Sequence, residues 1–312
     1  MTERAPERFV SVCCDLCGAD DPAPMIDLTD RMFHTTDEVF HLVRCRRCGH
    51  LYLNPRPGLA YLERYYAADY APFARSGIAG RVKRWTISRE VDELWPSLKP
   101  PACVVDVGSA TGDLLAAIRM HGNPNVLGIE PSEHAARLAR ERSGIETIVG
   151  TLEEAELATG SVDVLLMSHT IEHLPSPSNT LAEMARVLAP DGTLILWLPN
   201  ADSISARLLS RWWIGYDAPR HFHDFTPDSL RRLLAKQGFK IEKIRQEWIG
   251  LEWSWALRLM AHERLQNARL DVLLARIHPL LTIGLTPVSG VAAIARRAGR
   301  IRVVARRRGD PS

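Results

Sequence analysis

The feature that most constrains this chain is an alternation of short apolar runs with helix-like segments between residues 102 and 247. The pattern predicts strands at 103–107, 126–130, 146–149, 162–168, 193–198 and 239–246. It predicts helices at 113–121, 132–143 and 179–188, and a further helix that begins with Thr226 as N-cap and ends at Gly238. Near-continuous apolar strands that alternate with helices are typical of a parallel sheet covered on both faces.

Two further segments extend this α/β region. Residues 300–307, RIRVVARR, are predicted to form a last strand that closes the sheet, and residues 248–299, rich in Leu, Ile, Ala and Trp, a helical insert before it. We therefore divide the chain into an N-terminal metal module at 1–60, a helical connector at 61–100, the α/β core at 101–247, the insert at 248–299, and a last strand with a basic tail at 300–312.

The cysteines indicate a metal site at the N-terminus. Four of the six form two Cys-x-x-Cys-Gly units, and each unit can place two thiolates on one turn around a tetrahedral ion. Four sulfur ligands leave no open position, so the predicted Zn²⁺ is structural and the module resembles a zinc ribbon. The alternatives are a redox pair or ordinary buried thiols, with Cys13 as an alternative ligand and Cys103 as a core residue. The predicted ligands are Cys14, Cys17, Cys45 and Cys48.

Charge and hydropathy exclude several classes of protein. Hydrophobic residues make up 46% and charged residues 24%, which is a globular composition. Lys and Arg number 39 against 37 Asp and Glu, a balance that disfavours a dedicated nucleic-acid binder. The first ten residues lack the apolar stretch of a signal peptide, and the chain has no uninterrupted run of about 20 apolar residues. These features predict a cytoplasmic protein.

A glycine-bearing turn, DVGSATGD at 106–113, lies between the first predicted strand and helix. Its glycines let the backbone approach a ligand, and the helix N-terminus favours an anionic group. The spacing is G-x-A-x-G and not the G-x-G-x-x-G of dinucleotide sites. Glu130 closes the second strand, where a carboxylate can accept both ribose hydroxyls, and residues 151–153 follow the third strand, where an adenine edge can be held. The predicted cofactor residues are Asp106, Gly108, Ser109, Gly112, Glu130, Pro131, Thr151, Leu152 and Ser168.

These residues, together with SHTIEHLP at 168–175 and LAPDGT at 188–193, resemble the motifs of class I S-adenosylmethionine-dependent methyltransferases. The resemblance covers about residues 100–247 and the last strand. It implies a doubly wound, Rossmann-like, mostly parallel seven-stranded sheet and S-adenosyl-L-methionine as cofactor. It also implies that the glycine turn holds the methionine moiety and that Glu130 grips the ribose. Ala110 departs from the family, because many members have Gly there and Ala narrows the approach.

The acceptor side is less defined. The Asn-Pro-Pro-Tyr loop of related DNA and protein N-methyltransferases is absent, which disfavours adenine and glutamine-amide substrates. Residues 212–226 resemble the P-R-H-x-x-x-F-[ST] segment of methyltransferases that act on small molecules and envelope precursors. There we expect His221 as a base and Arg220 as a clamp for a substrate carboxylate or phosphate. The predicted catalytic residues are His221, His169, His173, Tyr216 and Arg220; alternatively, the histidines only shape loops through local hydrogen bonds.

The insert and the C-terminus suggest where an apolar acceptor would bind. Residues 279–295 carry no charge, and seven arginines follow within 296–308. The segment 279–308 is either a helical cap with a solvated basic end, or a peripheral contact with the inner membrane face or a lid for a lipid-linked acceptor.

The prediction is therefore an enzyme that methylates an oxygen, or a carbon, of a small or carrier- or lipid-linked metabolite such as a sugar or secondary metabolite. The N-terminal part is similar to that of sugar C-methyltransferases, which carry a further large C-terminal domain that these 312 residues lack. Two alternatives are a zinc-containing RNA methyltransferase and a non-catalytic binding module with a degenerate fold.

Overall fold

The computed structural model describes residues 7–66 and 77–307, and its centre is a seven-stranded sheet in the order β12-β13-β10-β9-β6-β7-β8. The strands are β6 Val104–Val107, β7 Val126–Glu130, β8 Thr147–Val149, β9 Val162–Ser168, β10 Leu188–Pro199, β12 Phe239–Glu247 and β13 Arg300–Arg307. β13 runs antiparallel to β10 and β12, whereas β8, β7, β6, β9 and β10 pair in parallel. The predicted doubly wound, mostly parallel sheet is confirmed.

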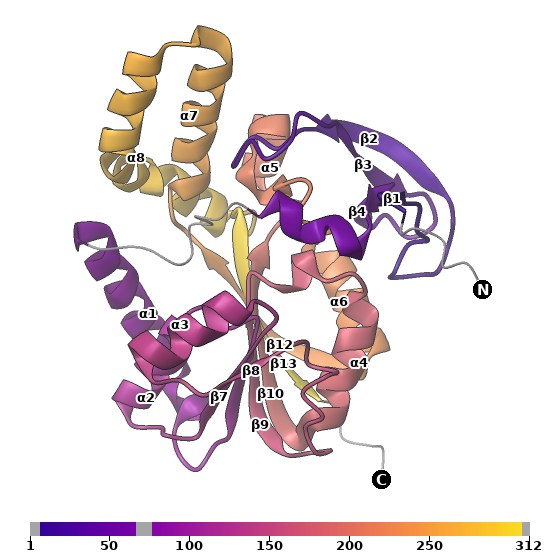
Figure 1. Ribbon diagram of the computed structural model, residues 1–312, viewed down its shortest axis with the longest axis vertical. Helices are drawn as coiled ribbons and strands as arrows, with labels where there is room; N and C mark the ends of the chain where they lie inside the picture. The colour runs from indigo at the N-terminus through magenta and orange to yellow at the C-terminus, as the bar shows by residue number, and fades with distance from the viewer. Residues whose placement is uncertain (1–6, 67–76, 308–312) are drawn as a thin grey trace.

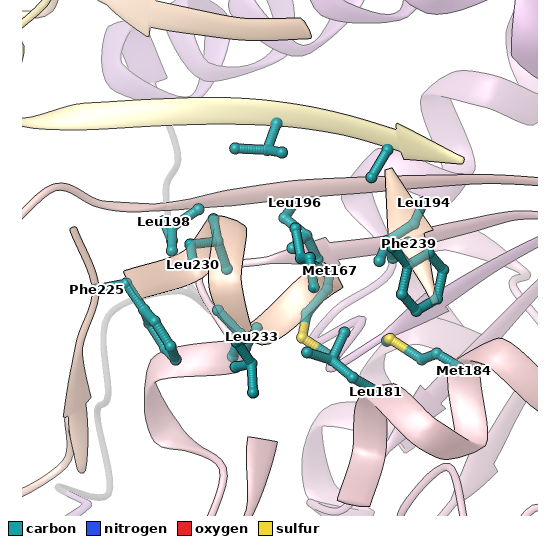
Figure 2. Packing of buried hydrophobic residues seen from close by; sticks show 14 of the residues in the cluster. Met167, Leu181, Met184, Leu194, Leu196, Leu198, Phe225, Leu230, Leu233 and Phe239 are labelled. Atoms are coloured by element: carbon teal, nitrogen blue, oxygen red, sulfur yellow. The ribbon is translucent and has the colours of Figure 1, made fainter. Parts of the chain in front are cut away.

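Helices cover both faces of this sheet (Figure 1). α1 Gly77–Leu98, α2 Asp113–His121 and α3 Glu133–Ser143 lie on one side, and α4 Pro177–Val187 and α6 Pro227–Lys236 on the other. β9 is apolar on both faces for this reason: Val164 and Leu166 pack with α1 and α2, whereas Leu165 and Met167 pack with α4 and α6. Figure 2 shows the second of these cores, where Met167 meets side chains of both helices.

The start of α6 follows its sequence signals closely. Thr226 is the N-cap, its Oγ1 accepts a hydrogen bond from the Ser229 amide (3.1 Å), and Ser229 Oγ accepts one from the Thr226 amide (3.0 Å). This reciprocal pair satisfies two of the orphan donors of the first turn. It thereby fixes the exit of the loop that joins β10 to α6, where much of the predicted acceptor site lies.

The N-terminal module is a small antiparallel sheet. It contains β2 Pro22–Leu28, β3 Phe40–Cys45 and β4 Leu51–Leu53, and β1 Phe9–Val10 pairs separately with β5 Arg56–Pro57. Its fourth strand, β11 His223–Asp224, comes from the loop after β10, so the module and the core share one sheet. A 3-10 helix, η1 Leu59–Tyr65, leads into the connector, of which residues 67–76 lie outside the described part.

The segment after β12 forms a helical hairpin. α7 Leu251–Leu265 and α8 Ala268–Ile294 project from the body of the molecule, and α5 Ile204–Leu209 lies beside their base (Figure 1). Within the described residues, one helix, Arg269–Ile294, is long and apolar enough to cross a membrane, with a mean hydropathy of 1.5 in its most apolar window, of which 11% is buried. Since β12 is parallel to the central strands, the hairpin starts at the carboxyl edge of the sheet.

Candidate functional site

The glycine turn after β6 forms the first part of the site. Gly108 and Gly112 have φ values of +76° and +72°, which favour glycine. A Cβ at Gly108 would lie 2.4 Å from Thr170 Oγ1, so glycine lets the loop after β9 pack directly on the turn. The Gly108 amide donates to the Ile129 carbonyl at 2.8 Å, which holds the turn against the end of β7.

Two buried polar groups in this turn have no hydrogen-bond partner among the described residues: Asp106 Oδ1 and Ser109 Oγ. Burial, and secondarily the nearby Glu130, raises the pKa of Asp106 to about 7. Buried polar groups are normally paired, so these two atoms fit a ligand that brings hydrogen-bond donors or positive charge.

Glu130 holds the turn in its present shape. Its Oε2 accepts a hydrogen bond from the Ala110 amide and its Oε1 one from the Ser132 amide, both at 2.9 Å. Burial raises the pKa of Glu130. Ala110, the departure from the family pattern, has a φ of +47° and therefore occupies a backbone region that glycine adopts more readily.

The remaining predicted cofactor residues contribute in different ways. Pro131 follows β7 and is exposed, and Ser168 ends β9 with its carbonyl accepting a hydrogen bond from Thr170 Oγ1 (3.2 Å). The Thr151 amide donates to Glu154 Oε2 (2.8 Å), which closes a local turn. Leu152 is buried in the core, so its backbone and not its side chain is the part that would contact a ligand.

A carboxylate surrounded by histidines forms the second part of the site. Glu172 lies in η3 Ile171–His173, directly after β9, and is almost fully buried. Its Oε1 lies 3.4 Å from His169 Nδ1 and 4.0 Å from His221 Nε2, yet neither carboxylate oxygen has a hydrogen-bond partner within the described chain. Burial raises the pKa of Glu172, but His169, His221 and His173 together lower it more, to about 2.

Two of these histidines are oriented by backbone carbonyls. His173 Nδ1 lies 3.0 Å from the Arg220 carbonyl, and His221 Nδ1 lies 2.7 Å from the Gly215 carbonyl. Their rings meet edge to face with centroids 4.5 Å apart. Burial, and then the proximity of His221, lowers the pKa of His173 to about 4. His169 has a side chain that is 37% exposed, which makes it the solvent-accessible member of the cluster.

The role predicted for Arg220 is wrong for this arrangement. Its side chain is 0% exposed, and all five N–H groups are used. They donate to Asp217, to Asp30 of the N-terminal module, and to the Tyr65 carbonyl, with the shortest contacts to the carboxylates at 2.6 and 2.7 Å. A guanidinium with every donor occupied cannot clamp a substrate anion. Arg220 instead links three segments of the chain.

Tyr216 occupies a packing position. It is buried and meets Trp213 edge-on at a centroid distance of 4.8 Å. Burial raises its pKa. Its place in the core cluster with Phe222 favours a structural role over the predicted catalytic one.

Sequence reasoning missed several acidic partners in this region. Asp217 lies three residues before Arg220, a spacing that signals a local ion pair, but Asp30 lies 190 residues away and carries no such signal. Asp224 is buried beside the cluster, and burial, with Glu172 and Asp217, raises its pKa well above the usual range. Glu172 was visible only as the residue between His169 and His173.

The four predicted cysteines converge. The Sγ atoms of Cys14 and Cys48, and those of Cys17 and Cys45, are 3.5 Å apart, and all four lie within 4.8 Å of one another. Four thiolates around one ion at about 2.3 Å have comparable sulfur–sulfur separations, so the donor set fits tetrahedral Zn²⁺.

The two knuckles have the same backbone design. Gly18 and Gly49 have φ values of +72° and +75°, and their amides donate to the carbonyls of Cys14 and Cys45 at 2.7 and 2.8 Å. Cys13 is exposed and lies outside this group of four, and Cys103 is half-buried against the main core.

The metal module is anchored to the core beside the acceptor loop. Arg232 of α6 donates to the Cys48 carbonyl at 2.6 Å. Asp15, between Cys14 and Cys17, accepts hydrogen bonds from the Ser178 amide and from Ser176 Oγ at 2.8 and 2.7 Å, and so caps the start of α4. The knuckles therefore lie against α4 and α6.

Comparisons with known proteins agree with this geometry. A family model described as a methyltransferase domain matches residues 81–244. The ubiquinone/menaquinone biosynthesis C-methyltransferase UbiE of Campylobacter jejuni is 31% identical over 106 residues, which are 32% of this chain and 45% of that protein. The ubiquinone biosynthesis O-methyltransferase of Thiobacillus denitrificans is 28% identical over 165 residues, 48% of this chain and 71% of that protein. For several curated relatives, the match spans between a third and just under half of their length.

A solved structure shows the same fold. The S-adenosylmethionine-dependent methyltransferase from Archaeoglobus fulgidus superimposes with a TM-score of 0.50 at 16% identity, covering 72% of this chain and 94% of that one.

Proposed function

This chain belongs to the family of S-adenosylmethionine-dependent methyltransferases, and from that premise we propose that it methylates an oxygen, or a carbon, of a small or lipid-linked metabolite. The observation that carries the proposal is the cluster of Glu172 with three histidines at the carboxyl end of β9. A hydroxyl or carbon acceptor must lose a proton, and a positioned imidazole is the usual group that takes it.

The glycine turn fits the cofactor. Asp106, whose Oδ1 is buried and unpaired among the described residues, suits a cationic group, and Glu130 lies where ribose hydroxyls would compete for its carboxylate. The cofactor, when bound, supplies an electrophilic methyl group. The chain's own contribution is to hold the turn and the acceptor close together, which Thr170 favours by packing on Gly108.

The histidines suit proton transfer at one defined atom. Since the Gly215 carbonyl can only accept, His221 donates from Nδ1, and its Nε2 carries the lone pair. His221 Nε2 lies 4.0 Å from carboxylate oxygens of both Glu172 and Asp217. His169, more exposed, offers a route from this cluster to solvent.

The α7–α8 hairpin favours an apolar acceptor at a membrane surface. Seven large apolar side chains on it are more than half exposed: Leu265, Val272, Leu273, Leu280, Ile283, Val291 and Ile294. Patches of this kind mark interaction sites, and six arginines against three carboxylates in residues 251–297 suit anionic headgroups. The two curated relatives named above carry ubiquinone or menaquinone biosynthesis in their names, which also favours an apolar acceptor.

The test of activity combines cofactor binding with turnover. We expect wild-type protein to bind S-adenosylhomocysteine in calorimetry, and to convert S-adenosylmethionine to S-adenosylhomocysteine when offered hydroxylated acceptors, including lipid-linked ones. His221→Ala should lower turnover by about 100-fold or more while cofactor affinity stays within a few-fold. His41→Ala, at an exposed His–Asp pair in the N-terminal module, is the control. Failure to bind S-adenosylhomocysteine would show that the methyltransferase fold of this chain is degenerate. RNA binding whose affinity falls steeply with salt concentration would favour an RNA substrate.

The acceptor class is tested on vesicles. We expect co-sedimentation with anionic vesicles at low salt, and loss of it in the variant Leu280→Ser/Ile283→Ser, whose two side chains are each 69% exposed. Met120→Ser, on α2 and 87% exposed, is the control. Wild-type protein that stays in the supernatant would remove the membrane part of the proposal.

A further inference from the structure

A second group of metal-ligating side chains lies apart from the four cysteines, in the acceptor half of the site. One ligand atom each from Glu172, His173 and His221 lies within 4.8 Å of the others. Glu172 and His173 come from η3, and His221 from the loop after β10. Arg220 holds this loop through five hydrogen bonds, so the relative position of the three side chains is set by buried structure.

The two histidines present their lone pairs from the same ring position. Each has Nδ1 within hydrogen-bond distance of a backbone carbonyl, Arg220 for His173 and Gly215 for His221. A carbonyl only accepts, so both rings donate from Nδ1 and carry the lone pair on Nε2. The Tyr66 hydroxyl, 3.3 Å from His173 Nδ1, can accept from the same N–H. A second nitrogen that donates to a carbonyl is the arrangement that orients histidine ligands of metal ions in proteins.

The carboxylate supplies an independent indication. Glu172 is 1% exposed, and both its oxygens lack a hydrogen-bond partner in the described part of the chain. Withdrawing a carboxylate from water without hydrogen bonds costs several kcal/mol, so a buried and unpartnered one requires a compensating charge. His169 Nδ1 lies 3.4 Å from its Oε1, and His221 Nε2 lies 4.0 Å from the same oxygen.

We propose that Glu172, His173 and His221 bind one divalent first-row transition-metal ion, distinct from the structural ion expected at the cysteines. Two imidazoles and one carboxylate are a borderline donor set that suits such ions, and three protein ligands leave coordination positions free.

The catalytic consequence rests on the function proposed above. An acceptor hydroxyl on a free position becomes more acidic, because the ion stabilises the alkoxide. The O–H bond breaks, and the proton passes to His169, which replaces His221 as the base because Nε2 of His221 is then occupied by the ion. The oxygen then forms a bond to the methyl carbon, and the electron pair of the methyl–sulfur bond remains on sulfur. The ion changes no oxidation state, so no oxidant or reductant is needed.

The test uses Mn²⁺, whose free form is read by electron paramagnetic resonance and which disfavours thiolates. Protein whose cysteine site is filled with zinc is titrated with Mn²⁺ in the presence of S-adenosylhomocysteine. We expect one Mn²⁺ per wild-type chain, and an Mn²⁺ affinity lowered about 100-fold or more in Glu172→Gln. Mutating a residue that only hydrogen-bonds to a metal ligand already lowers metal affinity by about 10–100-fold. Glu172→Asp, which keeps a carboxylate, should retain most of the affinity, and His41→Ala should bind as wild type.

Wild-type protein that binds no Mn²⁺, or Glu172→Gln that binds it equally well, would overturn the proposal. Retained S-adenosylhomocysteine affinity shows that each variant is folded. If Glu172→Gln no longer binds S-adenosylhomocysteine, the proposal is judged by the number of Mn²⁺ ions bound per wild-type chain and by the Mn²⁺ affinity of Glu172→Asp. The two proposals fail separately. A chain that binds Mn²⁺ but methylates no acceptor contradicts the function, and a chain that methylates an acceptor but binds no Mn²⁺ contradicts the metal site.

Discussion

Replacing Arg220 by Met should destabilise the folded protein strongly, because the guanidinium is the shared partner of two carboxylates in the interior. Arg220 Nη2 lies 2.7 Å from Asp30 and 2.6 Å from Asp217, and the arginine side chain is 0% exposed. Met preserves much of the side-chain volume but offers no donor. The variant therefore keeps the packing and isolates the electrostatic contribution.

The expected magnitude is that of one broken buried ion-pair network. Removing one partner of a buried pair costs about 3–5 kcal/mol, because the other charge stays buried and uncompensated. Two such costs should not add here, since Asp30 keeps hydrogen bonds from the amides of Phe33 and Thr35 and from Thr35 Oγ1, and Asp217 is 10% exposed. We therefore expect a loss of about 3–5 kcal/mol in the free energy of unfolding.

The pH dependence provides a second signature. Burial raises the pKa of Asp30, but Arg220 and Thr35 together lower it to about 2, below its ordinary 3.8. A depressed pKa stabilises the folded state above the unfolded value and loses that contribution as pH falls through the folded value. The difference between wild type and variant should therefore be constant above about pH 4 and narrow between about pH 4 and about pH 2.

The assay is urea unfolding of the zinc-loaded protein. Arg207→Gln, which breaks an exposed pair with Asp202, is the control and should cost at most about 1 kcal/mol. In a double-mutant cycle, Arg220→Met with Asp30→Asn should recover part of the loss. If Arg220→Met unfolds like wild type and instead raises KM for an anionic acceptor, the clamp predicted from sequence would be right and the structural role wrong.

Three further predictions concern the other parts of the site. Cys14→Ser should lose about one zinc per chain by mass spectrometry and melt at lower temperature, whereas Cys13→Ser should do neither, because Cys13 is exposed and outside the group of four. S-adenosylmethionine affinity should rise between about pH 6 and about pH 8, since Asp106 with a pKa of about 7 must ionise to face a cation; Asp106→Asn should flatten that profile in calorimetry. Gly108→Ala should weaken S-adenosylhomocysteine binding by at least tenfold, because its φ is +76° and its Cβ would meet Thr170 Oγ1; unchanged affinity would contradict the packing described.

The sheet was predictable because its strands carry strong local signals. The predicted strands at 126–130, 162–168 and 300–307 coincide with β7, β9 and β13. β10 is longer than its apolar run, since it begins at Leu188, whose partner in β9 is Val162. Pro190 and Gly192 lie where the register with β9 shifts between Leu188 and Thr193, so their local turn signal coincides with an irregularity within the strand.

The site was predictable in its residues but less so in their roles. The sequence places His221 next to Arg220, and an arginine beside a histidine in a loop reads as a substrate ligand. Its main partner, Asp30, lies 190 residues away, and local spacing carries no information about it. Burial of Arg220 distinguishes a structural ion pair from a substrate ligand. Whether a loop is buried depends on which other segments of the chain pack against it. For the same reason, the two unpaired oxygens of Glu172 became visible only in three dimensions.

The N-terminal module explains why this loop can be buried at all. On one side of His221, Arg220 is bound to Asp30 of the module. On the other side, His223 lies in β11, which pairs with β4, and its Nδ1 is 3.0 Å from Nε2 of His50, two residues after the second knuckle. His221 is thus held between two residues that are both fixed by the module. Loss of the structural metal should therefore reorient His221 and lower turnover. The four cysteines would then affect catalysis through the position of His221, without contacting substrate or cofactor.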